Sequence, residues 1–137
     1  MNKDIVIEVV GTHTADGNTE VIESKCDGQY YEKNGKHYLL YEELTENGTV
    51  KSIIKVSDEL LEVIKKGAAN SHLFYQAGET VKCNYDTPFG CIPIDINTKN
   101  LDIYVENHHI KVVVSYVMFC DEKQIAKCKL QINAKER

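Results

Sequence analysis

The sequence predicts an all-β protein, folded as an antiparallel up-and-down β-barrel of about 8–10 strands. Apolar and polar residues alternate along almost the whole chain of 137 residues, and glycine, asparagine or aspartate interrupts the alternation at short intervals. An open sheet of this size would expose two long edges and overtwist, so it must split into two sheets or close on itself. The connections are mostly of hairpin length, which favours a closed up-and-down barrel.

The first strands are marked by alternation and by turn residues. Gly28 lies within a long alternating segment and predicts a bulge or a sharp bend there. Asn34-Gly35 is the strongest hairpin signal, because both residues tolerate the positive φ of a type I′ turn. The expected strands in this half are Asp4–Thr14, Thr19–Lys33, Lys36–Leu44 and Thr49–Val56.

The segment from Ser57 to Gly67 is compatible with two structures. It has the features of a short helix, with Ser57 as the N-cap and Gly67 just beyond the C-terminus. It also fits a strand that follows a Ser-Asp turn and directs Leu61 and Val63 inward. We expect the strand, because a helix would separate strands that pair best with their sequence neighbours.

The middle of the second half is expected to contain four strands. Pro93 has no amide donor, so its strand should lie at an edge or carry a bulge. We expect a turn at Asn97–Asn100. The strands are Ser71–Ala77, Glu79–Asp86, one containing Ile92, Ile94 and Ile96, and one containing Leu101, Ile103 and Val105.

The last two strands show the clearest alternation, and they follow a hairpin at Asn107-His108. Even-numbered apolar positions run from Ile110 to Cys120, and after a turn at Asp121-Glu122 they resume. The expected inward residues are Ile110, Val112, Val114, Tyr116, Met118, Cys120, Ala126, Cys128, Leu130 and Ile132.

Charge and composition exclude several classes of function. The net charge is −5, and Arg137 is the only arginine among 16 basic residues, so we expect no nucleic-acid partner. The apolar stretches are too short to span a bilayer, and the N-terminal residues lack the pattern of a signal peptide, so we expect no membrane association and a cytoplasmic location. The five cysteines are then expected to be mostly buried free thiols.

Several blocks of sequence resemble the YwiB-like family of bacterial proteins, a domain of unknown function with the number 1934. The resemblance covers nearly the whole chain, and Tyr-x-Thr-Pro-Phe-Gly is its most specific part. It implies a calycin-like barrel of the lipocalin type in a small cytoplasmic protein, with no established activity or cofactor. The matching blocks are residues 30–35, 38–43, 55–57 and 85–90.

The chain departs from true lipocalins at the features that close the base of their barrel. It contains no tryptophan, and Arg137 lies beyond the last expected strand. Carriage of lipids outside the cell therefore does not follow from the resemblance.

The sequence does not identify an activity, and it supports two hypotheses. The first is a barrel that binds a small, largely apolar molecule in its mouth, through inward tyrosines and the break around residues 87–90. The second is a protein-interaction or self-associating module that uses the barrel exterior or an edge near Pro93, with no ligand. We expect no catalytic, cofactor or metal residues, and the sequence leaves open the oligomeric state and whether the interior is filled. The tentative ligand-binding residues are Tyr30, Tyr85, Thr87, Phe89 and Tyr116.

Overall fold

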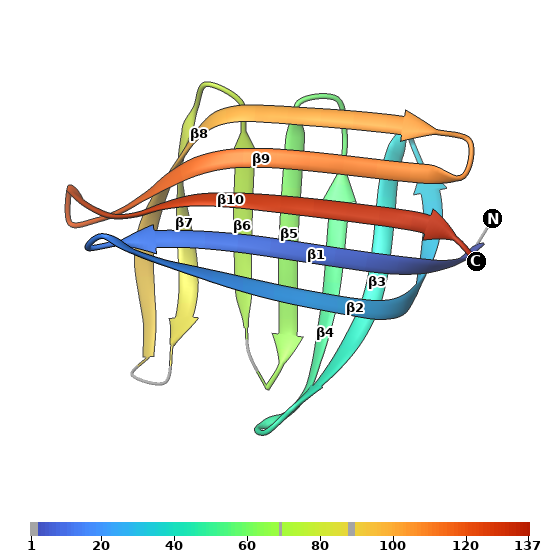
Figure 1. The fold of residues 1–137 in the computed structure, drawn as a ribbon, viewed down its shortest axis with the longest axis horizontal. Helices are drawn as coiled ribbons and strands as arrows, with labels where there is room; N and C mark the ends of the chain where they lie inside the picture. Colours follow the sequence, from blue (N-terminus) through green and yellow to red (C-terminus); the bar gives the residue numbers. More distant parts are fainter. Residues whose placement is uncertain (1–2, 69, 88–89) are drawn as a thin grey trace.

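The computed structural model is a closed antiparallel barrel of ten strands (Figure 1). It describes residues 3–68, 70–87 and 90–137, without the side chains of residues 86 and 87. This architecture confirms the predicted fold class. The strands are β1 (Lys3–Ala15), β2 (Asn18–Lys33), β3 (Lys36–Thr45), β4 (Gly48–Val56), β5 (Leu60–Gly67), β6 (Ser71–Gln76), β7 (Thr80–Thr87), β8 (Gly90–Glu106), β9 (His109–Cys120) and β10 (Lys123–Glu136).

Each strand pairs with its neighbours in sequence, and β10 returns to pair with β1. The closing ladder runs from Ile5 opposite Glu136 to Thr14 opposite Lys127. At its end the amide of Arg137 donates to the carbonyl oxygen of Asp4 at 3.0 Å. The start of β1 and the end of β10 therefore lie side by side (Figure 1).

The predicted turns and the ambiguous segment are resolved by backbone geometry. Asn34 and Gly35 have φ values of 54° and 77°, which confirms the expected hairpin with two left-handed residues. The segment after Ser57 forms β5, entered by a turn in which the Ser57 amide donates to the Leu60 carbonyl at 3.0 Å. The strand prediction is thus confirmed, and Val63 pairs with Ile54 on one side and Leu73 on the other.

The predicted turn at Asn97–Asn100 is wrong, because β8 is one continuous strand that bends at a bulge. Its register against β9 shifts between Thr98 and Asn100. The first part of β8 pairs with β7 up to Asn97, and the part from Asp95 onward pairs with β9. The barrel has two layers, one with β9, β10 and β1 and the other with β3–β7, whose strands run across each other (Figure 1). The bulge turns β8 from the second layer into the first. Pro93 precedes the pairing with β9, which confirms its predicted place at an edge.

β2 makes the second corner of the barrel, at Gly28. The pairing of β2 with β1 continues through Gly28 without a register shift, so the alternative of a bulge is wrong and the alternative of a bend holds (Figure 1). Pairing with β3 begins at Gly28, and residues 18–27 pair with β1 alone. Ile22 alternates in phase with Gly28, so the sequence pattern predicts an inward side chain, but Ile22 is 68% exposed in this part of β2, which pairs with β1 alone.

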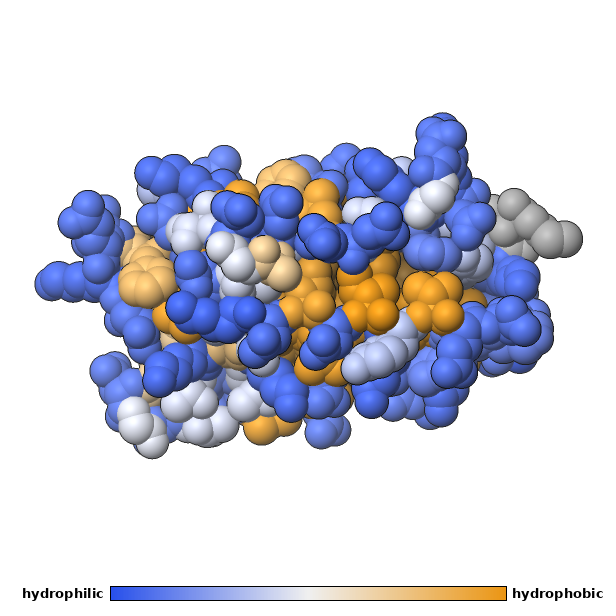
Figure 2. All heavy atoms as spheres, turned by 90° about the horizontal axis from the view of Figure 1, so that it is seen from above, coloured by the Kyte–Doolittle hydropathy of each residue, from blue (hydrophilic) through white to orange (hydrophobic). Residues whose placement is uncertain are grey.

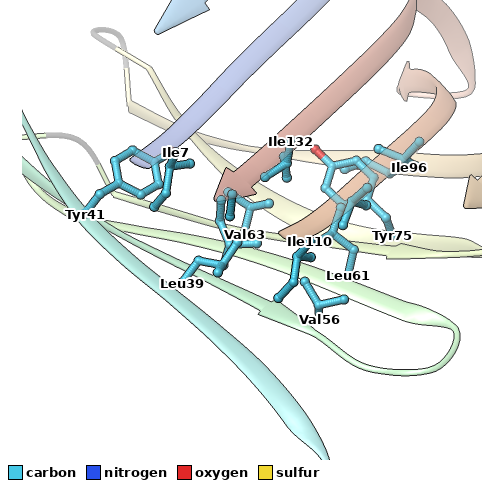
Figure 3. Close-up of a cluster of buried hydrophobic side chains, with 14 of the residues drawn as sticks. Ile7, Leu39, Tyr41, Val56, Leu61, Val63, Tyr75, Ile96, Ile110 and Ile132 are labelled. Carbon is cyan, nitrogen blue, oxygen red and sulfur yellow. The ribbon is translucent and has the colours of Figure 1, made fainter. Parts of the chain in front are cut away.

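The core is built from the inward faces of strands in both layers (Figure 3). The predicted inward set of the last two strands includes Val112, Val114 and Ile132, which are fully buried, and Ile5 and Ile7 of β1 are buried with them. The cysteines are free but less buried than expected. Cys83 and Cys128 are buried, Cys26 and Cys120 are half-buried, and Cys91 is exposed.

The outer surface is hydrophilic except for limited apolar areas. Figure 2 shows one face, on which apolar residues form a band bordered by hydrophilic residues. The exposed apolar residues include Tyr104 and Val105 on β8 and Val21 and Ile22 on β2. Among the described residues no helix has the length and apolar character needed to cross a membrane.

Replacing Gly28 with alanine should destabilise the barrel by about 1–3 kcal/mol, because there is no space for a methyl group at this corner. An added Cβ would lie 2.8 Å from Ile7 Cδ1 and closer still to the carbonyl oxygen of Leu40. Gly11→Ala is the matched control: its Cβ would lie 4.0 Å from the nearest atoms. Urea unfolding gives the free energy of unfolding of both variants. Equal values for the two would contradict the expected steric clash at Gly28.

Candidate functional site

The barrel interior is hollow at one end and nearly filled at the other. The larger cavity has a volume of about 330 Å³, and the smaller one, near the chain termini, has about 80 Å³. Between them lie fully buried side chains such as Leu61 and Val112. The barrel is therefore nearly filled at the end with the smaller cavity and hollow at the other end.

The larger cavity is lined mainly by aliphatic and aromatic side chains from β1 and from the strands β3 to β10. Its floor includes Tyr75 and Ile132, which are almost completely buried, and its rim includes Tyr85, which is 40% exposed. The full lining is Val9, His13, Tyr41, Ile54, Val63, Lys65, Asn70, Ser71, Leu73, Tyr75, Tyr85, Ile96, Tyr116, Met118, Leu130 and Ile132.

The predicted ligand-binding residues do not form one site. Tyr85 and Tyr116 line the larger cavity, whereas Tyr30 lines the smaller cavity at the other end of the barrel. The Thr87 side chain and Phe89 lie outside the described residues. The larger cavity is thus the candidate site, with two of the predicted tyrosines in its wall.

Burial raises the pKa values of three tyrosines of this cavity, so their hydroxyls stay neutral to a higher pH than usual. The rings of Tyr75 and Tyr116 meet edge to face with their centroids 4.7 Å apart. Burial raises the pKa of Tyr41 to about 12, and it raises the pKa values of Tyr75 and Tyr116 well above their usual value. These hydroxyls are therefore polar, uncharged groups in an apolar wall.

Lys65 is the only Lys, Arg, Asp or Glu in the described lining of the larger cavity. It follows Leu61 and Val63 on the inward phase of β5, and it is half-buried. Its cross-strand neighbours are Ser52 and Ser71. Lys65 is not among the ligand-binding residues expected from the sequence, although its i+2 spacing from Val63 is a signal that places it on the inner face.

Cys128 contacts His13 and Met118, which line the same cavity. Cys128 Sγ lies 3.6 Å from His13 Nδ1 and 3.7 Å from Met118 Sδ. His13 and Cys128 are opposite each other in the closing ladder, 115 residues apart in the chain. Sequence spacing alone carries no sign of this contact, because it depends on barrel closure.

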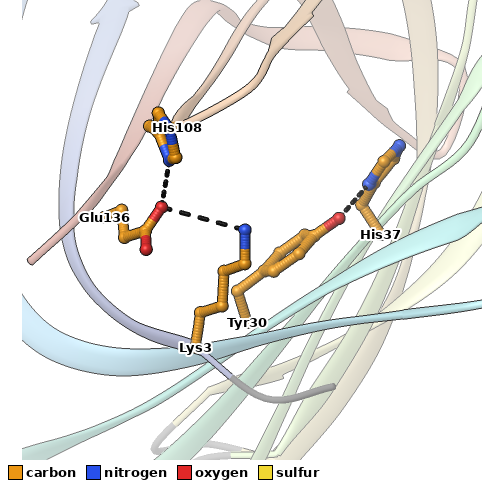
Figure 4. Close-up of polar contacts among 5 residues, drawn as sticks. All are labelled: Lys3, Tyr30, His37, His108 and Glu136. Atoms are coloured by element: carbon orange, nitrogen blue, oxygen red, sulfur yellow. Dashed lines mark hydrogen bonds and ion pairs between the residues drawn. The ribbon is translucent and has the colours of Figure 1, made fainter.

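The smaller cavity ends in polar contacts that hold the chain termini (Figure 4). Glu136 accepts from His108, and its carboxylate lies 3.8 Å from Lys3 Nζ. The hydrogen bond from His108 is the main cause of the lowered pKa of Glu136. Across the cavity, the Tyr30 hydroxyl and His37 Nδ1 are 2.7 Å apart. These contacts fix β1 to β10 and β2 to β3, and the cavity volume is too small for a drug-sized ligand.

Metal-binding groups made of three or more His, Cys, Asp or Glu side chains are absent from the described residues. The buried thiols are also poor nucleophiles, because burial raises the pKa values of Cys83 and Cys128. The polar groups of the larger cavity are therefore suited to hydrogen bonding rather than to covalent catalysis.

Together these features define a small antiparallel β-barrel whose interior opens into a cavity at one end. The chain belongs to the family described as a domain of unknown function (DUF1934), which matches residues 7–132. The uncharacterised beta-barrel protein YwiB of Bacillus subtilis (strain 168) is 31% identical over 120 residues, covering 88% of this chain and 84% of the relative. The crystal structure of the YwiB protein from Bacillus subtilis has a TM-score of 0.89 at 27% identity, covering 99% of this chain and 93% of that one. The predicted family is confirmed.

Alkaline titration should separate the buried tyrosines from the rest. Of the eight tyrosines, Tyr41 should ionise near pH 12, and Tyr75 and Tyr116 later still or only on unfolding. The pKa values of these tyrosines are higher in the folded state than in the unfolded state. Their contribution to the free energy of unfolding is therefore fully present below about pH 10 and is lost as the pH rises above it.

Tyrosinate absorbance and circular dichroism, followed together from pH 8 to 13, test this expectation. Tyr41→Phe should remove one late proton without changing the early phase. Ionisation of all eight tyrosines near pH 10 in a folded barrel would contradict it.

Proposed function

We propose that this protein binds a small, largely apolar molecule in the larger cavity. The observation that supports the proposal is the cavity volume of about 330 Å³, inside an otherwise well-packed core. Ligand sites in proteins have volumes of about 300–1,000 Å³, with apolar walls and few polar groups. The described lining fits this pattern, since most of its members are aliphatic or aromatic.

The polar groups of the wall favour a ligand with one acidic group. Lys65 supplies a positive charge, and the lining described above contains no Asp or Glu that would compete for it. The hydroxyl of Ser71 is a further polar group in the same wall. A single lysine neutralises one negative charge, so a monoanion such as a small carboxylic acid with an apolar body fits better than a nucleotide.

We also infer a cytoplasmic location, because all five cysteines are free and such thiols persist in a reducing compartment. The calycin or lipocalin relationship stays a prediction. It agrees with ligand binding inside a barrel, but fold alone does not assign that function.

Leu73→Trp should fill the larger cavity and weaken binding of the fluorescent probe anilinonaphthalene sulfonate by about tenfold or more. Leu73 lines the cavity, whereas Leu44 is 88% exposed, so Leu44→Trp is a matched control with the same change of side chain. Fluorescence titration measures both affinities, and circular dichroism verifies folding. Equal affinities for the two folded variants would contradict the proposed site.

Lys65→Met should weaken binding of the sulfonate probe about fivefold or more, because it removes the positive charge of the wall. Binding of N-phenylnaphthylamine, which has the same apolar skeleton without the sulfonate, should stay unchanged. Lys66→Met is the matched control, since Lys66 is exposed and does not line the cavity. An equal loss for both probes would contradict recognition of an acidic group.

A second candidate function, protein interaction, is favoured by the free edge of β2. Residues 18–27 pair with β1 alone and expose Val21 and Ile22, so a second copy of the chain has a strand to pair with. The edge near Pro93, predicted for this role, is shorter. Light scattering after size exclusion distinguishes the candidates: a dimer that Ile22→Lys dissociates would favour interaction, and a monomer without change would count against it.

A further inference from the structure

Three soft ligand atoms lie on the same inner face of three adjacent strands. Cys128 on β10 is opposite His13 on β1, and on its other side β9 carries Met118, which is opposite Ala126. Cys128 Sγ is 3.6 Å from His13 Nδ1 and 3.7 Å from Met118 Sδ. His13 and Met118 both line the larger cavity, so an ion in the cavity can reach the cluster.

The separations of these atoms match those of ligands that share a metal ion. Bonds of about 2.3 Å to sulfur and about 2.0 Å to nitrogen, at angles of about 110–120°, place two ligand atoms about 3.5–4.0 Å apart. Both distances from Cys128 Sγ fall in this range. Cys128 is therefore spaced from each of its two neighbours as one ligand of a metal ion is spaced from another.

The chemistry of the set selects among metals. A thiolate, a thioether and an imidazole are soft or borderline ligands, a combination that favours Cu(I) over Mg²⁺ or Ca²⁺. Binding releases the thiol proton of Cys128 and forms a sulfur–copper bond, so the thiolate and the monovalent ion together are neutral. A neutral centre suits an apolar wall, whereas a divalent ion would leave an uncompensated charge.

We propose that Cys128, Met118 and His13 form a binding site for Cu(I). These three residues are not the ones that would recognise the acidic group of an apolar ligand. The proposed metal site therefore does not depend on the proposed ligand binding. His13 is exposed at the mouth, where it reaches an incoming ion first, and Cys128 and Met118 then supply the two sulfur ligands.

Competition with the Cu(I) chelator bathocuproine disulfonate, under anaerobic reducing conditions, tests the site on the full-length protein. We expect the wild type to hold one Cu(I) more tightly than any further equivalent, and Met118→Leu to weaken that equivalent about tenfold or more. This substitution conserves volume, so it leaves the wall packed.

Two cysteine variants distinguish the site from general thiol binding. Cys128→Ser should abolish the tight equivalent, while Cys120→Ser, on a thiol that belongs to β9 but not to the cluster, should keep it. X-ray absorption should show a mixed sulfur and nitrogen shell whose nitrogen is lost in His13→Phe. Retention of the tight equivalent in folded Cys128→Ser or Met118→Leu would overturn the proposal, as would its loss in Cys120→Ser.

Discussion

The pairing of β1 with β10 is the constraint on which the interior of this protein depends. Every other ladder joins strands that follow one another in sequence, so those pairs form by local hairpins. The closing ladder joins Ile5 to Glu136 and Thr14 to Lys127, and therefore orders almost the whole chain at once. It also removes the two edges that an open sheet would expose. The contact between His13 and Cys128, and the cavity wall around it, exist only because this ladder is formed.

Two bent strands determine where the interior is full and where it is hollow. β2 bends at Gly28, and β8 bends at the bulge between Thr98 and Asn100. Each strand contributes to both layers, so the layers approach each other closely near the smaller cavity, where Leu39 and Val56 are buried completely. Beyond the β2 corner, residues 18–27 leave β3 uncovered, and the barrel opens toward the larger cavity. The same geometry produces a potential ligand site and an unpaired edge.

The sequence predicts strands well because their alternation reflects the local choice between the inner and outer faces. The inward series from Ile110 to Val114 and the turn at Asn34-Gly35 are decided within a few residues, and both predictions are confirmed. Predictions fail where the answer depends on which strand lies alongside. Ile22 alternates like a core residue but has no covering strand, and Asn97–Asn100 has the composition of a turn but forms a bulge under pairing with β9.

In the candidate site, too, local features can be predicted from the sequence and features that depend on neighbouring strands cannot. Tyr85 and Tyr116 both line the larger cavity, whereas Tyr30 lies at the other end, because the phase of a strand does not tell which end of a barrel a residue faces. The inward position of Lys65 can be predicted from the alternation of β5. The contact between Cys128 and His13 cannot be predicted in this way, because 115 residues separate them in the chain. A cavity with neutral tyrosines, one lysine and a sulfur-containing cluster is thus a property of the closed barrel as a whole.

Native-state hydrogen exchange, measured for individual amides by NMR, tests barrel closure most directly. Amides that bond between β1 and β10 should exchange only through global unfolding, with a free energy equal to that from urea denaturation. Amides on the uncovered edge of β2, between residues 18 and 27, should exchange much faster in the same sample. Exchange of the β1–β10 amides at a lower free energy than those of the β3–β4 hairpin would show that the barrel is not held closed by its termini.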